Sequence, residues 1–220
     1  MAVDEAILES FISGQSIPTL RFYGWSESTI SIGKLQPISS IPQGWGSSIV
    51  RRPTGGRAVF HGNDLTFSLV VGAAVLGHPV HESYRRVGQA VGEALQSLEI
   101  PAQFCQNTSP AASIREIGNC FDLTLEYELT VGGKKVLGSA QVRRAEAVLQ
   151  QNSLAPPSKD CTWPERDDLV AEIIGSVESS FGIIIEEGRL SETELKIARH
   201  LTDNKYAIES WNLCSASHSN

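Results

Sequence analysis

Arg51-Arg52-Pro53-Thr54-Gly55-Gly56-Arg57-Ala58-Val59-Phe60-His61 is the most informative run of the sequence, and it lies between two predicted strands, 48–51 and 65–71. Adjacent glycines let backbone N–H groups approach a ligand without interference from a Cβ atom, and arginines offer forked donors to phosphate or carboxylate oxygens. Gly-Gly alone is usually a turn, and Arg-Arg alone is usually a solvated edge. Together, and between strands, they predict an anion-binding loop.

The segments before this loop, 19–23 and 29–32, are also rich in β-forming residues and are bounded by Gly, Pro and Ser clusters. We therefore expect these two segments and the two flanking strands to belong to one sheet. Earlier still, a helix that stops at Gly14 is predicted from Ile7, Leu8, Phe11 and Ile12. After the loop, an amphipathic helix over 82–98 is predicted from Val87, Ala90, Val91, Ala94, Leu95 and Leu98.

A hairpin is predicted further along the chain, where 125–131 and 134–142 flank Gly132-Gly133, a dipeptide that accepts positive φ. A third strand over 147–154 follows. The last third has helical spacing, and Ser191 with Glu194 forms a capping box. These elements predict a single α+β domain over 1–220, with a mixed, largely antiparallel sheet and flanking helices. Within this domain, residues 158–220 are expected to form a small helical C-terminal annex.

A lysine and a run of small residues follow that turn. A lysine at a strand edge normally faces solvent, but Gly138, Ser139 and Ala140 come just after Lys135 and leave room for a ligand against the strand. The charge of Lys135 would then act on a carbonyl or phosphate. Cys120 lies upstream; such a thiol is by default buried and inert, but near a lysine it becomes a candidate thiolate nucleophile.

Composition and the other titratable residues narrow the functional classes. The 220 residues are 41% hydrophobic, and 25 acidic against 18 basic residues give a formal charge of −7, which argues against nucleic acid as a partner. No apolar run approaches the roughly 20 residues that span a bilayer. The four cysteines are far apart and no charged leader precedes an apolar stretch, so we expect a cytoplasmic protein. The five histidines are dispersed, which predicts no metal site.

The motifs resemble those of the lipoate–protein ligase A and cysteine-dependent octanoyltransferase family, whose fold is related to the catalytic domain of biotin–protein ligases. The resemblance covers most of the chain. Its most specific parts are the run 51–61 paired with Lys135-Val136-Leu137-Gly138-Ser139-Ala140, and it also includes Asp4-Glu5-Ala6, Asp64-Leu65-Thr66-Phe67-Ser68 and Cys120-Phe121-Asp122. Where family members often carry a His-Gly-Ser run, this chain has Gln150-Gln151-Asn152-Ser153-Leu154.

The resemblance implies roles for individual residues. The acyl or acyl-adenylate pocket would be lined by Arg52, Gly55, Gly56, Arg57, Ala58, Val59 and His61, together with Gly138, Ser139 and Ala140. Lys135 would contact the reacting carboxyl, and Cys120 would be a nucleophile that carries the acyl group as a thioester. From the residues alone, His61 stays open between a structural role and an acid–base role.

Three functions are consistent with these features. The first is transfer of an octanoyl or lipoyl group to a lysine of a lipoyl domain, such as the glycine-cleavage H protein or a 2-oxoacid dehydrogenase E2 subunit, without a cofactor. The donor would be octanoyl-acyl carrier protein or lipoate. The second is an ATP- and Mg-dependent lipoate–protein ligase that forms a lipoyl-adenylate. Residues 158–220 are too few for the accessory domain of such ligases, which favours the transferase. The third, motivated by the missing histidine, is a non-catalytic acyl-binding module.

Overall fold

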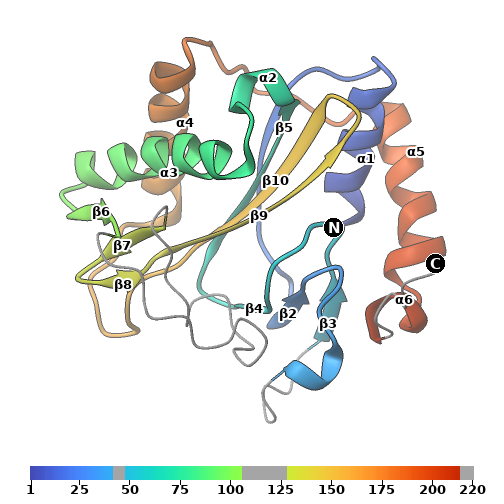
Figure 1. Ribbon diagram of the computed structural model, residues 1–220, viewed down its shortest axis with the longest axis horizontal. Coiled ribbons are helices and arrows are strands. Elements are labelled where there is room, and N and C mark those ends of the chain that lie inside the picture. Colours follow the sequence, from blue (N-terminus) through green and yellow to red (C-terminus); the bar gives the residue numbers. More distant parts are fainter. Residues whose placement is uncertain (42–47, 106–127, 214–220) are drawn as a thin grey trace.

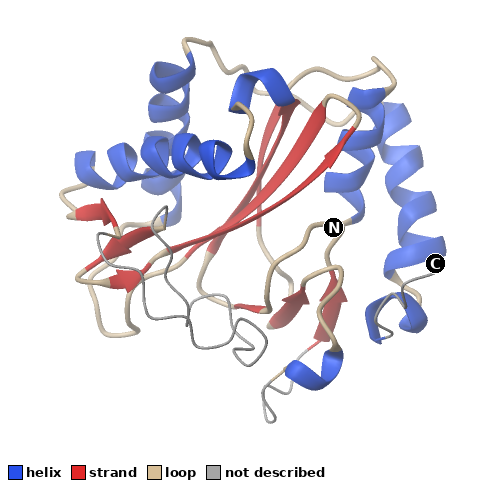
Figure 2. Ribbon diagram, viewed as in Figure 1, coloured by secondary structure: helices blue, strands red, loops and turns tan. Residues whose placement is uncertain are grey.

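The computed structural model describes residues 1–41, 48–105 and 128–213 of the chain. It confirms the predicted α+β architecture, with helices on both faces of a central antiparallel sheet (Figure 1; Figure 2). The order of the four strands in this sheet is β1 (Thr19–Tyr23), β5 (Leu65–Gly72), β10 (Ala147–Leu154) and β9 (Leu137–Arg144). Helices α1 (Ala2–Ile12) and α5 (Glu192–Leu201) lie on one side, and α3 (Val80–Ser97) and α4 (Arg166–Phe181) lie on the other.

Strand β5 shows how the two faces of this sheet differ. Every second residue, including Leu65, Phe67 and Leu69, packs into the main hydrophobic core. On that side α3 contributes Val87, Val91 and Leu95, and α4 contributes Leu169, Ile173 and Val177. The alternate residues Thr66 and Ser68 are just as buried but face a polar region, because successive side chains of a strand point to opposite faces. One face of the sheet therefore forms the main core, and the other carries polar residues beside a smaller apolar cluster that Val70 forms with Ile7 and Leu8 of α1.

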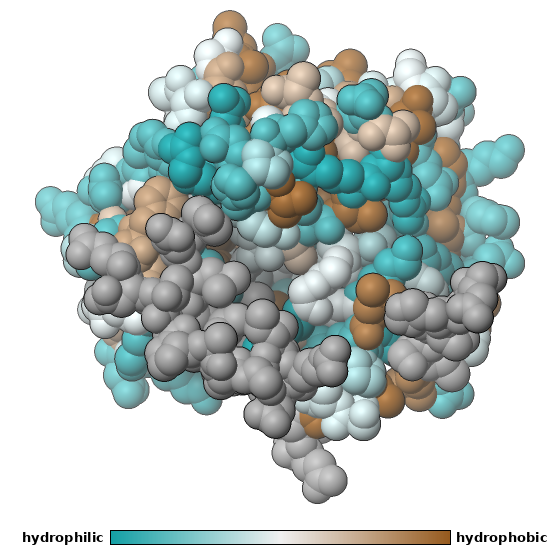
Figure 3. Space-filling model, viewed as in Figure 1, coloured by the Kyte–Doolittle hydropathy of each residue, from teal (hydrophilic) through white to brown (hydrophobic). Residues whose placement is uncertain are grey.

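The amphipathic helix predicted over 82–98 is α3. Its apolar stripe is buried, while Arg85 and Arg86 on the opposite side are exposed and pair with Glu82. Figure 3 shows hydrophilic residues over this helix on the face in view. The short helix α2 (Ala73–Leu76) precedes it, and strand β6 (Ala102–Phe104) follows it.

The expectation that the first four strands share one sheet is wrong. Strand β2 (Thr29–Ile32) pairs in parallel with β3 (Ser48–Arg51) and antiparallel with β4 (Val59–His61), which makes a separate three-stranded sheet. Strands β1 and β10 occupy both edges of β5, so no strand of the smaller sheet pairs with it. The short helix η1 (Ile38–Ser40) lies in the connection between β2 and β3.

The predicted strand 134–142 is divided between two sheets. Strand β8 (Lys134–Lys135) pairs with β7 (Leu129–Val131), which in turn pairs with β6, whereas β9 joins the central sheet. Val136, between β8 and β9, is fully buried and donates its N–H to the carbonyl of Leu129. The predicted turn is confirmed, because Gly132 and Gly133 have φ values of 57° and 77°. Residues 125–127 lie outside the described part of the chain.

A buried carboxylate attaches the C-terminal helices to α1. Glu5 accepts hydrogen bonds from Arg144 (2.6 Å), Lys205 (2.6 Å) and the hydroxyl of Tyr206 (2.5 Å). The latter two residues belong to η3 (Thr202–Tyr206), which continues α5 and precedes α6 (Glu209–Leu213). Burial alone would raise the pKa of Glu5, but the hydrogen bonds from these three groups outweigh it and hold the pKa below its usual value.

The shifted pKa of Glu5 predicts a pH-dependent stability. A carboxyl group with a lower pKa in the folded state stabilises the fold above its unfolded pKa of about 4.5, and this contribution is lost as the pH falls through the folded value. Glu5→Gln should lower the free energy of unfolding at pH 7 by roughly 1–3 kcal/mol and weaken its dependence on pH below 4.5. Chemical denaturation at several pH values measures both effects.

Glu9→Gln is the matched control, because Glu9 lies one helical turn away, is 41% exposed and only approaches Arg144 at 3.8 Å. It should change stability by less than about 0.5 kcal/mol. Equal effects of the two substitutions would contradict the proposed role of Glu5.

Candidate active site

A pocket lies where the polar face of the central sheet meets the smaller β3-β2-β4 sheet. It brings together the two groups of residues that the sequence singled out. From the first group the lining includes Arg52, Gly56, Val59 and His61, and from the second it includes Gly138, Ser139 and Ala140. These residues are far apart in the chain, and the approach of Gly56 to Ala140 is close enough that a Cβ on Gly56 would lie 3.5 Å from that of Ala140.

Other predicted site residues have different positions. Gly55 and Arg57 are in the same loop but do not line the pocket, and Ala58 is fully buried against Ile30 and Ile32. Lys135 is buried on β8, where its Nζ forms an ion pair with the carboxylate of Glu128, and it is also not among the lining residues. Cys120 lies outside the described residues.

The loop holding these glycines has a tight contact with the end of β2. A Cβ atom on Gly33 would lie 1.9 Å from the carbonyl oxygen of Gly56, so only glycine fits at position 33. Gly56 itself has a φ of +85°, a conformation that residues with a side chain rarely adopt. Gly55 has open space around its Cβ position and no such φ. The two adjacent glycines are therefore not equivalent, and Gly56 is the one that the backbone requires.

The arginines of the loop bind backbone carbonyl oxygens. Nη1 of Arg52 donates to the carbonyl (2.7 Å) and the hydroxyl (2.8 Å) of Ser31, and Nη2 donates to the carbonyls of Gly55 (3.0 Å) and Arg57 (2.8 Å). Arg51 similarly donates to the carbonyls of Gly33 (2.9 Å) and Gln36 (2.7 Å). The forked donors that suggested anion binding thus also hold the loop in its shape, while the charge of Arg52 stays at the pocket wall.

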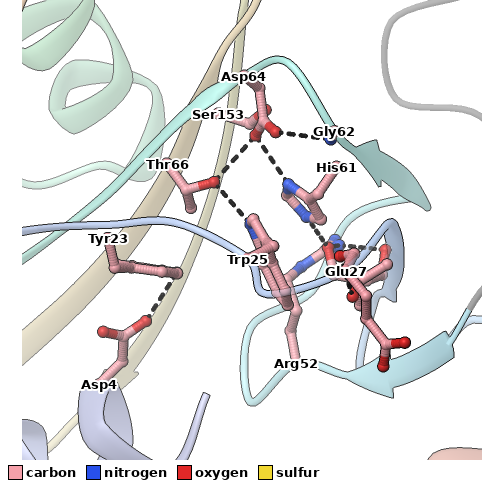
Figure 4. A network of polar contacts seen from close by, with 12 residues as sticks. Asp4, Tyr23, Trp25, Glu27, Arg52, His61, Gly62, Asp64, Thr66 and Ser153 are labelled. Carbon is pink, nitrogen blue, oxygen red and sulfur yellow. Dashed lines mark hydrogen bonds and ion pairs between the residues drawn. The ribbon is translucent and has the colours of Figure 1, made fainter. Parts of the chain in front are cut away.

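His61 connects the loop to a buried carboxylate (Figure 4). Its Nε2 lies 2.7 Å from Oγ of Ser31, and its Nδ1 lies 2.7 Å from Oδ2 of Asp64. Because Arg52 already donates to Oγ of Ser31, the hydroxyl proton is available for Nε2, and Nδ1 then carries the ring proton that Asp64 accepts. The indole of Trp25 stacks on the imidazole at 4.2 Å. His61 therefore lines the pocket, and both of its ring nitrogens form hydrogen bonds with other residues of the chain.

Asp64 is the centre of this network. Its Oδ2 also accepts hydrogen bonds from the hydroxyls of Thr66 (2.9 Å) and Ser153 (2.7 Å). Burial alone would raise the pKa of Asp64, but the hydrogen bonds from His61, Ser153 and Thr66 outweigh it and hold the pKa below its usual value. Asp64 is therefore an ionised acceptor that orients the imidazole at the pocket wall.

A second buried carboxylate supports the opposite side of the pocket. Asp4 on α1 accepts hydrogen bonds from Arg21 (2.6 Å), Tyr23 (3.0 Å), Ser68 (2.9 Å) and Gln151 (2.7 Å). Gln151 also accepts a hydrogen bond from the hydroxyl of Thr54 at 2.9 Å. It therefore links α1 to the loop that carries Gly55 and Gly56, here called the glycine loop.

Several lining residues were missed as site residues by the sequence reasoning, namely Tyr23, Ser31, Thr66, Gln151, Asn152 and Ser153. A signal for some of them was present, because polar residues alternate with apolar ones along 65–69 and occupy four consecutive positions at 150–153. In strands that are buried along nearly their whole length, such polar positions mark a site or a buried network rather than a solvent face.

The described residues contain no group of three or more His, Cys, Asp or Glu side chains that could hold a metal ion. Within the same ranges, no helix is long and apolar enough to cross a membrane.

The contact between Gly33 and Gly56 predicts a sharp difference between glycines. Gly33→Ala should lower the free energy of unfolding by about 1–3 kcal/mol, because the new methyl group must push away backbone atoms of the loop. Gly55→Ala should change it by less than about 0.5 kcal/mol. Urea denaturation of the two variants beside the wild type measures this; a Gly33→Ala protein as stable as Gly55→Ala would refute the contact.

Comparison with known proteins agrees with this geometry. Residues 1–156 match the family model of the lipoyl protein ligase A/B catalytic domain. The chain is 31% identical over 258 residues to octanoyltransferase LipM of Symbiobacterium thermophilum, and the alignment covers 97% of this chain and 93% of that protein.

Solved structures show the same fold. Protein Ta0514 of T. acidophilum with bound lipoic acid superimposes with a TM-score of 0.81 at 25% identity, over 96% of this chain and 91% of that chain. Lipoate-protein ligase A bound with ATP gives a TM-score of 0.80 at 25% identity, over 96% and 92% of the two chains. Since the family model matches well over half of its residues, this chain belongs to the lipoyl protein ligase A/B catalytic domain family.

Proposed function

We propose that this protein is an acyltransferase that moves an octanoyl group from a carrier thioester to the lysine of a lipoyl domain. The observation that carries this proposal is the likeness, along nearly the whole of both chains, to a relative named as an octanoyltransferase. The pocket supports it, because the glycine loop and the small residues of β9 leave space beside buried strands for a narrow acyl chain. Burying the chain would contribute on the order of 0.8 kcal/mol per methylene.

The reaction takes place in two steps. The thiolate of Cys120 attacks the donor carbonyl, the carbon–sulfur bond to the carrier breaks, and the carrier thiolate leaves and takes up a proton. The amine of the acceptor lysine then attacks the resulting thioester, an amide forms, the lysine nitrogen loses a proton, and the Cys120 thiolate is released. The role of Cys120 rests on the sequence. By the same resemblance, the charge of Lys135 would stabilise both the thiolate and the developing oxyanion.

The partners follow from this chemistry. The acceptors would be lipoyl domains of the glycine-cleavage H protein or of 2-oxoacid dehydrogenase E2 subunits, the donor would be octanoyl-acyl carrier protein, and no cofactor would be consumed. With such partners, the protein would act in the cytoplasm.

ATP-dependent ligation is the alternative, and the structural likeness to an ATP-bound ligase motivates it. An adenylate-forming enzyme needs cations for the phosphates and a magnesium ion. Here both Nη atoms of Arg52 already donate to atoms of the chain itself, which favours transfer over adenylation. The non-catalytic module accounts least well for a pocket that joins both predicted groups.

Intact-mass spectrometry separates the three functions. After incubation with octanoyl-carrier protein alone, a transferase gains the mass of one octanoyl group, and the adduct disappears when a lipoyl domain is added. A ligase gives no adduct but modifies the lipoyl domain with lipoate and ATP. A binding module does neither, and either of the last two results would overturn the proposal.

The nucleophile is tested by substitution of Cys120. Cys120→Ala should reduce octanoyl transfer by several orders of magnitude and abolish the mass adduct, because a covalent step cannot be replaced by binding. Cys120→Ser should restore little, since a hydroxyl has no comparable population of anion near neutral pH. Cys105→Ala and Cys161→Ala are the controls, because both thiols are half-buried and neither is proposed as the nucleophile; they should keep near-normal rates. Full activity of Cys120→Ala would show that the nucleophile lies elsewhere.

A further inference from the structure

Two neighbouring amide side chains on β10 form a buried polar cluster beside the pocket. Asn152 pairs with Ser139 of β9 across the ladder, and Gln150 lies two residues earlier on the same face of β10. Oδ1 of Asn152 accepts hydrogen bonds from the hydroxyl of Ser139 (2.8 Å) and from Nε2 of Gln150 (3.0 Å). The orientation of the Asn152 amide is thereby set, because its oxygen faces two donors.

The cluster leaves hydrogen-bonding capacity unused. Within the described residues, Nδ2 of Asn152 and Oε1 of Gln150 are buried and have no hydrogen-bond partner, and Asn152 is only 2% exposed. Buried polar groups in native proteins are nearly always paired, so an unpaired one at a pocket is a sign of a missing ligand group. Of the two side chains only Asn152 lines the pocket, alongside Ser139 and Gly138.

The chemistry of the unpaired atom selects the group that it would bind. Nδ2 is a donor, so its partner must be an acceptor. An octanoyl thioester has one polar oxygen, at its carbonyl, and an alkyl chain against Nδ2 would leave the amide unpaired and buried. The polar position therefore fits the reacting end of the acyl group and not its hydrocarbon tail.

We propose that Asn152 donates a hydrogen bond from Nδ2 to the carbonyl oxygen of the bound acyl group, and that Ser139 and Gln150 act as positioning residues for its amide. This inference rests on the proposed acyl transfer and adds a contact to it. During attack on the carbonyl, negative charge develops on that oxygen, so a donor fixed in advance stabilises the transition state more than the bound substrate. Asn152 thereby acts on the rate more than on affinity.

The test compares two unreactive ligands that differ only at the carbonyl. S-(2-oxononyl) pantetheine carries a ketone where a thioester carbonyl would lie, and S-nonyl pantetheine has a methylene there. Asn152→Leu, which keeps the branching at Cγ but has no donor, should weaken binding of the ketone about five- to tenfold relative to the alkyl ligand, as measured by calorimetry. In turnover it should lower kcat by roughly 10² to 10³ with a much smaller change in KM.

Ser139→Ala provides a graded comparison, because it keeps the Asn152 amide and removes one of the bonds that orient it. Its kcat should lie between the kcat of the wild type and that of Asn152→Leu. If Asn152→Leu does not fold, as judged by circular dichroism, Asn152→Ala replaces it with the same ligand pair. A structural role alone would weaken both ligands equally.

The outcomes distinguish this inference from the function on which it rests. Equal losses for the two ligands, or an unchanged kcat, would overturn the role of Asn152 while octanoyl transfer by the wild type stands. If the wild-type protein neither transfers octanoyl groups nor binds the ketone, the proposed function fails and this contact fails with it.

Discussion

The hydrogen bonds to the carboxylate of Asp64 join the central sheet and the smaller sheet at one site. This carboxylate accepts hydrogen bonds from residues on β4, β5 and β10, and β4 belongs to a different sheet from the other two. A carboxylate offers several acceptor positions, so one buried charge can orient His61, Thr66 and Ser153 together. His61 in turn fixes Ser31, and Ser31 accepts from Arg52 of the glycine loop. The pocket wall thus depends on a charge at its periphery.

The alternation of side chains along β5 and β10 explains why a buried site is possible here. Each strand contributes one set of residues mainly to the core under α3 and α4. The other set is divided between the polar networks around Asp4 and Asp64 and a second apolar cluster with α1. The protein therefore pairs its buried polar groups with each other and keeps the core apolar. Asn152 and Gln150 depart from this pattern, because they lie on the core side of β10 and each keeps one unpaired amide atom.

Much of this architecture could be predicted from the sequence. The strands 19–23, 29–32, 48–51 and 147–154 have the predicted bounds, because turn residues mark their ends, and the Gly132-Gly133 turn has the expected conformation. The assignment of strands to sheets could not be predicted, since it depends on which edges are already occupied. Two groups of residues were recognised from their chemistry, and the structure brings them to one pocket. Ser31 and Asp64 were not assigned roles, because their partners are defined only by tertiary contacts.

Val136 has a mechanical consequence for the transferase. Its N–H donates to the carbonyl of Leu129 in the β7–β8 hairpin, and its carbonyl accepts a hydrogen bond from the N–H of Ala155, just beyond the end of β10 in the central sheet. Lys135 and Gly138 therefore lie on either side of a residue that is hydrogen-bonded both to the β7–β8 hairpin and to the end of the central sheet. A macromolecule that displaced the β7–β8 hairpin would therefore displace the charge of Lys135 together with the part of β9 that lines the pocket. Movements of the hairpin and of the strand beside the pocket would then be coupled through the backbone at Val136.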